Sequence, residues 1–86
     1  MMNYDASIIV PIYNEFNSLK SITHKIKDAF KDCNIKYIFI DDGSSDGSME
    51  WLKENLKKIF KKNNFELINL DKNFGKGYAI KQGIKK

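Results

Sequence analysis

Cysteine is nearly missing from this sequence, and arginine is missing entirely. Cys33 is the single cysteine among 86 residues, and all 15 basic residues are lysine. A lone cysteine excludes a disulfide framework and a cysteine-rich zinc site within the chain, and it fits a reducing, cytosolic setting. Long hydrophobic runs are missing too, so we expect no membrane span. The N-terminus also lacks the basic-then-apolar layout of a secretory signal.

Histidine is equally scarce, because His24 is the only one. A cysteine nucleophile would need it as a partner, and no local pattern pairs His24 with Cys33. The net charge of +4 fits phosphorylated ligands or an anionic membrane surface. Because the lysines are spread along the chain without a recognisable nucleic-acid motif, we expect solvated helix faces and no nucleic-acid partner.

Proline also occurs once, and it marks the first expected strand. Pro11 closes the β-branched run Ser7–Val10, and because proline cannot donate a backbone hydrogen bond, we expect the strand to end there. From about Ser18, apolar residues recur every three or four positions. Asn17 or Ser18 is expected to cap the start of this segment. This period predicts an amphipathic helix whose apolar stripe is Leu19, Ile22, Ile26, Ala29 and Phe30.

The remaining chain alternates between the same two patterns. Strands are expected over Lys36–Ile40 and Phe65–Leu70. The helix between them is expected to start at a Ser48 cap and to bury an apolar face made of Met49, Leu52, Leu56 and Ile59, widened by Trp51 and Phe60.

A third helix is expected from Lys76 to the end of the sequence. Its spaced apolar positions are Tyr78, Ile80 and Ile84, and the small residues Ala79 and Gly83 permit close packing. The order β-α-β-α-β-α with short connections predicts an α/β fold with a parallel sheet and right-handed crossovers.

Three loops are therefore expected to converge where the parallel strands end, which is where such sheets bind ligands. They are residues 11–15, 41–47 and 71–75, and each contains a carboxylate. In the second loop Asp41 and Asp42 are adjacent, so we expect one to bind the loop's own amides and the other to face a ligand. The same loop is also a good turn and capping sequence that needs no ligand, and the residues alone leave both interpretations open.

Two other ligand motifs fail on spacing. A calcium loop from Asp42 would need a glutamate where Lys53 stands, and a strand precedes it rather than a helix. The segment 73–77 is neither a P-loop nor a full dinucleotide fingerprint, although its amides and Lys76 are placed to face an anion at a helix start.

Taken together, three segments resemble family-2 glycosyltransferases with the GT-A fold. The opening signature of that family resembles Val10–Glu15, and its second signature resembles Ile40–Ser48. The third segment of the branch with dolichyl- and polyprenyl-phosphate sugar synthases resembles residues 73–77 together with Ala79 and Gly83. The resemblance covers about Ser7 to Ile84 and implies three β-α units forming a parallel sheet, the N-terminal portion of a GT-A (Rossmann-like) nucleotide-diphospho-sugar transferase fold.

The resemblance also implies a nucleotide-sugar site. Pro11, Tyr13 and Glu15 would line the base and ribose of a UDP- or GDP-linked sugar. The family inverts the anomeric carbon by direct displacement, which implies a hexosyl transfer to a lipid phosphate or a glycan in cell-envelope glycan synthesis.

The second and third segments would complete this site. Asp42 would accept a hydrogen bond from the ring N–H of the base, with Asp41 beside it. Ile40 would border the base through its backbone, and Lys76 would lie near the diphosphate.

The family's Asp-x-Asp motif has no counterpart in this sequence. Its carboxylates hold Mg²⁺ or Mn²⁺ on the diphosphate of full-length members, and the acceptor side and catalytic base follow it. We therefore expect residues 1–86 to be a single partial domain, truncated before that motif, with no metal ligands and no catalytic residue of its own. The isolated chain is expected to be weakly stable and catalytically inactive.

The partners follow from the same resemblance. We expect a nucleotide-sugar, a lipid-phosphate acceptor and, through a sheet edge left open by the missing fourth strand, pairing with another chain. The expected location is the cytoplasm, at the cytoplasmic membrane face. A non-catalytic nucleotide-binding module and a degenerate remnant without a ligand are the alternatives to a glycosyltransferase part.

Overall fold

Three parallel strands form the centre of the molecule in the order β1-β2-β3. The computed structural model describes residues 4–61 and 63–85. The strands are β1 (Ala6–Ile12), β2 (Ile35–Asp42) and β3 (Phe65–Leu70). The helices are α1 (Leu19–Ala29) after a 3₁₀ turn η1 (Phe16–Ser18), α2 (Ser48–Ile59) and α3 (Lys76–Ile84).

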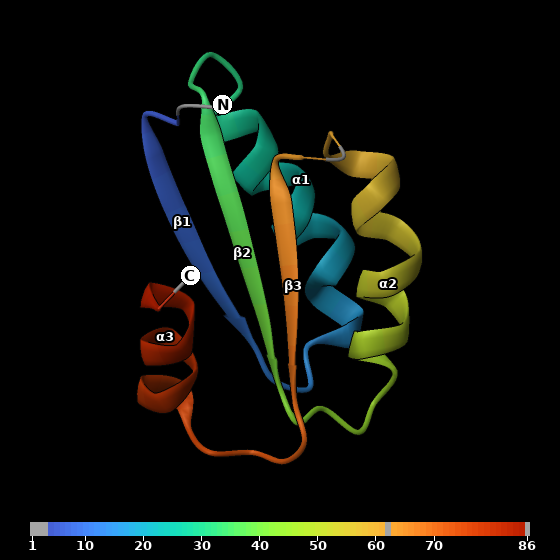
Figure 1. The fold of residues 1–86 in the computed structure, drawn as a ribbon. Helices are drawn as coiled ribbons and strands as arrows, with labels where there is room; N and C mark the ends of the chain where they lie inside the picture. The colour runs from blue at the N-terminus through green and yellow to red at the C-terminus, as the bar shows by residue number, and fades with distance from the viewer. Residues whose placement is uncertain (1–3, 62, 86) are drawn as a thin grey trace.

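Helices cover both faces of this sheet. Figure 1 shows α1 and α2 on one face and α3 on the other. Alternate residues of β2 point to opposite faces, so Tyr37 and Phe39 join the larger core beneath α1 and α2, while Ile38 and Ile40 join a smaller core beneath α3. The α/β prediction with a parallel sheet is confirmed.

The first strand runs further than the sequence predicted. Pro11 lies inside β1 and pairs with Ile40 of β2, and Ile12 pairs with Asp41. The expectation that Pro11 ends the strand was wrong. Because β1 pairs with β2 alone among the described strands, the outward-facing backbone positions of this edge strand have no ladder partner, and proline is tolerated there.

The helix α1 buries part of its predicted stripe. Leu19 is fully buried and Ile22 and Ile26 are half-buried, whereas Ala29 and Phe30 are exposed. The residue that the apolar pattern missed is Thr23, which is fully buried. Its hydroxyl donates to the backbone carbonyls of Leu19 and Lys20, and this local bond removes the cost of burying a polar group.

The buried face of α3 differs from the predicted one. Tyr78 and Ile84 are 41% and 70% exposed, and the small residues Ala79 and Gly83 face the sheet instead. A Cβ atom added to Gly83 would lie 2.7 Å from side-chain atoms of both Ile9 and Ile40. The close packing predicted for Ala79 and Gly83 is therefore present. Tyr78 and Ile84 are left exposed, whereas Ile80 is half-buried.

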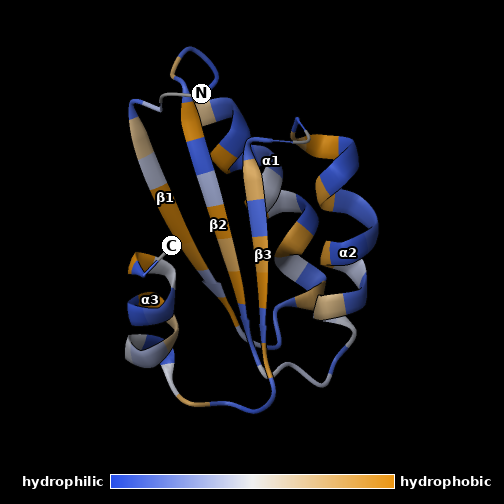
Figure 2. Cartoon of the chain, in the orientation of Figure 1, coloured by the Kyte–Doolittle hydropathy of each residue, from blue (hydrophilic) through white to orange (hydrophobic). Residues whose placement is uncertain are grey.

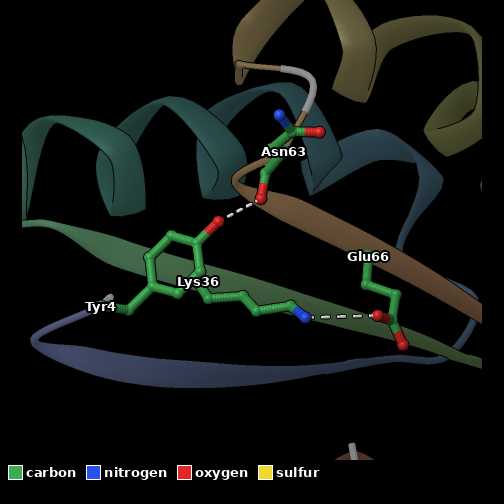
Figure 3. A network of polar contacts seen from close by, with 4 residues as sticks. All are labelled: Tyr4, Lys36, Asn63 and Glu66. Carbon is green, nitrogen blue, oxygen red and sulfur yellow. Dashed lines mark hydrogen bonds and ion pairs between the residues drawn. The ribbon is translucent and has the colours of Figure 1, made fainter. Parts of the chain in front are cut away.

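Two polar contacts lie at the end of the sheet where the strands begin. Figure 3 shows the Tyr4 hydroxyl donating to the backbone carbonyl of Asn63, and the Lys36 ammonium 3.4 Å from the Glu66 carboxylate. At the lower side of Figure 2, β2 ends on the hydrophilic Asp41 and Asp42, whereas β1 ends on Ile12 and β3 on Leu70. No helix in the described part of the chain combines the length and the hydropathy that a membrane crossing requires.

Candidate functional site

The three strand-end loops meet around one pocket, as the topology predicted. The pocket has a volume of about 440 Å³ and is lined by Pro11, Ile12, Tyr13, Glu15, Asp42, Asn73, Gly75 and Lys76. Most of the predicted site residues are therefore brought together. Two other hollows lie along α1 and α2, with Cys33 in one and His24 in the other, and neither contains residues of these loops.

Two of the predicted site residues are not part of the lining. Ile40 is fully buried in the smaller core beneath α3, so its side chain is unable to reach a ligand. Asp41 is 1% exposed. Its Oδ2 accepts from the Ser44 N–H at 3.0 Å, and its Oδ1 is buried without a hydrogen-bond partner among the described residues.

Asp42 joins the end of β2 to the third loop. Its carboxylate accepts hydrogen bonds from the Phe74 N–H at 2.9 Å, the Gly75 N–H at 3.1 Å and the Asn73 side-chain amide at 3.2 Å. A carboxylate offers about four acceptor positions, so these three donors occupy most of Asp42, which is 2% exposed and is among the pocket-lining residues. Sequence reasoning anticipated the amide contact of one aspartate with its own loop, which Asp41 makes, but it gave no signal for this second attachment.

The second and third loops also touch backbone to backbone. Gly43 has a φ of 75°, and a Cβ atom there would lie 2.3 Å from the Lys72 carbonyl carbon and 2.4 Å from the Asn73 nitrogen. Both observations require glycine, because other residues rarely adopt this φ and none fits the space. The contact brings Asn73 and Gly75 to the pocket.

Side chains of the second loop hold the backbone of the first. The Asn14 N–H donates to Ser44 Oγ at 2.9 Å, and the Phe16 N–H donates to Asp46 Oδ2 at 3.0 Å. The Glu15 N–H lies 3.2 Å from Ser48 Oγ. Serine and aspartate are thus used here to join two loops, and the turn-and-capping interpretation of this segment explains only part of their contacts.

The start of α2 is capped differently from the prediction. Ser48 is the first helical residue and Gly47 is the N-cap, so the expected Ser48 cap was wrong. Asp46 Oδ1 accepts from the Ser48 N–H at 3.0 Å and from the Ser48 hydroxyl at 2.6 Å. A carboxylate two residues upstream takes over the capping role, which frees Ser48 Oγ to accept from the first loop.

Asp46 should make stability depend on pH. The hydrogen bond from the Ser48 hydroxyl is the largest cause that lowers the pKa of this carboxyl below its ordinary value. Desolvation opposes it, and hydrogen bonds from the Phe16 and Ser48 backbone amides lower the pKa further. A lowered folded-state pKa contributes stability that is present above the unfolded pKa of about 4 and is lost as pH falls through the folded value. We expect the urea midpoint of Asp46→Asn to fall less between neutral pH and about pH 3 than that of the wild type.

The exposed carboxylate Glu50 provides the control for this experiment. It lies in the first turn of the same helix, and Glu50→Gln removes one carboxylate charge while leaving the contacts of Asp46 in place, so the change caused by Asp46→Asn should be the larger of the two. If the urea midpoints of Asp46→Asn and of the wild type fell equally as the pH was lowered, the Asp46 contacts would not stabilise the folded chain.

The described residues do not fit a divalent metal ion. Among them, no group of three or more His, Cys, Asp or Glu side chains is close enough to hold one. Of the two aspartates at the end of β2, Asp42 is surrounded by N–H donors and one oxygen of Asp41 binds Ser44, so Glu15 is the remaining carboxylate of the pocket lining.

Known proteins resemble this chain in sequence and in fold. A family model described as Glycosyl transferase family 2 matches residues 7–86. The chain is 36% identical over 92 residues to a dolichyl-phosphate beta-glucosyltransferase of Dictyostelium discoideum, an alignment that covers 95% of this chain and 27% of the relative. It is 32% identical over 81 residues to an undecaprenyl-phosphate 4-deoxy-4-formamido-L-arabinose transferase of Pseudomonas savastanoi, covering 92% of this chain and 23% of the relative.

A solved structure shares the fold. It is the mannosyltransferase PcManGT from Pyrobaculum calidifontis in complex with GDP-Man and Mn2+, with a TM-score of 0.79 and 20% sequence identity, over 99% of this chain and 25% of that one. The likeness shows the GT-A type of α/β fold. The chain spans about a quarter of the length of these proteins.

Proposed function

Because the chain belongs to glycosyl transferase family 2, we propose that its loop pocket binds the nucleoside diphosphate of a sugar donor. The observation that carries this proposal is the assembly of Pro11, Tyr13, Glu15, Asp42 and Lys76 around one pocket, at the sheet edge where parallel α/β sheets bind ligands. A pocket of about 440 Å³ is within the usual range for small-molecule sites.

In this proposal the first loop contacts the base and the ribose. Tyr13 is 47% exposed at the pocket, where its ring offers a flat apolar surface for a base. Glu15 is an acceptor suited to ribose hydroxyls, and its backbone is held in place by Ser48.

Asp42 and Lys76 supply the charged contacts. Asp42 accepts the ring N–H of the base at the position that Asn73, Phe74 and Gly75 leave free. Lys76 is exposed at the first position of α3, where its ammonium and the positive end of the helix both favour the diphosphate. Asp41 and the Ile40 backbone support Asp42 from behind rather than contacting the donor through side chains.

The whole protein would transfer the sugar with inversion to a lipid phosphate, the acceptor class named for the two similar transferases. Residues 7–86 would form the donor-binding part of one domain in this scheme. The described residues supply donor recognition, and a metal on the diphosphate and a base for the acceptor would be held by residues outside them.

Titration with GDP and with UDP tests the proposed pocket. We expect one of the two to cause saturable shifts of backbone amide signals at Tyr13, Asp42 and Lys76. Lys76→Gln should weaken binding of that diphosphate by about threefold to tenfold, since a partly exposed charge-assisted contact contributes roughly 0.7–1.4 kcal/mol.

The matched control is Lys81→Gln, on the same helix but away from the pocket lining, which should leave the affinity unchanged. The corresponding nucleoside, which has no phosphate, should bind equally to the wild type and to Lys76→Gln. The absence of saturable shifts with both diphosphates would contradict the proposal and favour a degenerate remnant.

A further inference from the structure

Asn14 has an unusual backbone conformation between two pocket residues. Its φ is 48°, the only positive value for a non-glycine residue in the described ranges 4–61 and 63–85. This left-handed region is disfavoured for L-residues, and asparagine tolerates it better than most. Tyr13 and Glu15, its two neighbours, line the pocket, whereas Asn14 does not.

Two hydrogen bonds hold Asn14 in this conformation, and both reach the second loop. Its backbone N–H donates to Ser44 Oγ at 2.9 Å, and its side-chain Oδ1 accepts from the Ser45 N–H at 2.8 Å. The contact is therefore reciprocal, because the backbone of each loop donates to a side chain of the other. The partners are 30 and 31 residues away in sequence, so the bonds fix one loop relative to the other rather than closing a local turn.

The attachment continues into the buried end of β2. Ser44, which accepts from Asn14, donates its own N–H to Asp41 Oδ2 at 3.0 Å. The next residue of that strand, Asp42, holds the third loop. Asn14 thus joins the one loop that carries Tyr13 and Glu15 to the framework on which the rest of the pocket is built.

We infer that Asn14 is a positioning residue for nucleotide recognition, a role that rests on the proposed donor site. It contacts no ligand itself. It holds Tyr13 and Glu15 against the second loop before the nucleotide arrives, so binding does not have to order the first loop. A longer or β-branched residue would lose both the left-handed conformation and the bond to Ser45.

Three substitutions at Asn14 separate its backbone conformation from its side-chain bond. Asn14→Gly keeps the conformation and loses the bond, Asn14→Ala loses both, and Asn14→Asp keeps both, because a carboxylate oxygen also accepts from the Ser45 N–H. We expect the Kd of the diphosphate that binds the wild type, GDP or UDP, to rise about tenfold in Asn14→Gly and more in Asn14→Ala. Asn14→Asp should stay within about twofold of the wild type.

Ser45→Ala is the matched control, since the Ser45 backbone rather than its side chain makes the bond, and its Kd should not change. Ser44→Ala removes the other contact and should also weaken binding, which keeps the test informative if Asn14→Ala does not fold. Amide hydrogen exchange at Ser45 should be faster in Asn14→Gly without any ligand, whereas exchange in the core strand β2 should be unchanged.

The possible failures differ in their pattern. Wild-type affinity in both Asn14→Gly and Ser44→Ala would overturn the positioning role and leave the donor site intact. Binding weakened as much in Asn14→Asp as in Asn14→Gly would also overturn the positioning role. The oxygen that Asn14→Asp retains for the Ser45 N–H would then have no effect on binding. A wild-type chain that binds neither GDP nor UDP would overturn the donor site and the positioning role together.

Discussion

Gly43→Ala is expected to destabilise the chain by about 3 kcal/mol or more, a large share of the roughly 4–13 kcal/mol typical for a domain of this length. Two costs combine at this position. The φ of 75° is strained for alanine, and the new Cβ atom would lie 2.3 Å from the Lys72 carbonyl carbon. Because the clashing atoms belong to backbone, relief requires the second and third loops to separate, and nucleotide binding should be lost with them.

Two further glycine-to-alanine substitutions separate these costs. Gly75 has φ 98° and ψ 153°, a region that is almost restricted to glycine, with no atom within 4 Å of an added Cβ, so Gly75→Ala should cost only the strain, about 1–3 kcal/mol. Gly77 has open space and no positive φ, so Gly77→Ala in α3 should stabilise by about 0.5–1 kcal/mol. Urea unfolding of the three variants measures the order, and a Gly43→Ala chain as stable as Gly75→Ala would contradict the close contact between the loops.

Asp42→Ala is expected to have the second largest effect, also about 3 kcal/mol. The Phe74 N–H, the Gly75 N–H and the Asn73 side-chain amide would lose their acceptor, and each unsatisfied donor costs roughly 1 kcal/mol where water reaches it in part. The third loop would then detach from β2, and we expect neither GDP nor UDP to bind. Amide hydrogen exchange at Phe74 and Gly75 should accelerate more than exchange in α1.

The neighbouring aspartate offers a matched comparison at equal burial. Asp41 and Asp42 are 1% and 2% exposed, but within the described residues Asp41 accepts one hydrogen bond, from the Ser44 N–H. Asp41→Asn keeps an oxygen for that bond and removes a buried charge, so we expect a cost below about 1 kcal/mol. Equal losses in Asp41→Asn and Asp42→Asn would show that burial of the pair, rather than the contacts of Asp42, determines stability.

The sequence predicted the elements well because their hydrophobic periods differ clearly. The run Ile38–Ile40 lies in a strand covered on both faces, and Leu52 and Leu56 are buried on α2 as their spacing predicted. The pattern failed where a polar or very small residue takes a core position. Thr23 is buried because its hydroxyl bonds within its own helix, and Gly83 is buried because α3 approaches the sheet closely.

The sequence also predicted the candidate site only in part. The placement of Pro11, Tyr13, Glu15, Asp42 and Lys76 at one sheet edge follows from strand order alone, since parallel strands end on the same side. Ile40 is kept from the pocket lining by the packing of α3. Asp41 is kept from it by the alternation of side chains in β2, which places Asp41 and Asp42 on opposite faces. The sequence had predicted for Ile40 a contact through its backbone and for Asp41 a place beside Asp42, and both stay predictions.

The sequence by itself determined a parallel α/β chain of glycosyl transferase family 2, with its polar loops at one edge of the sheet. Local periodicity and strand order are properties of the chain, so they need no tertiary information. Only the tertiary structure decided which acceptors hold which loop, because hydrogen bonds between residues about 30 positions apart leave no local pattern. It showed Asp42 committed mainly to the third loop and Asn14 joined to the second, and both follow from how closely the loops pack.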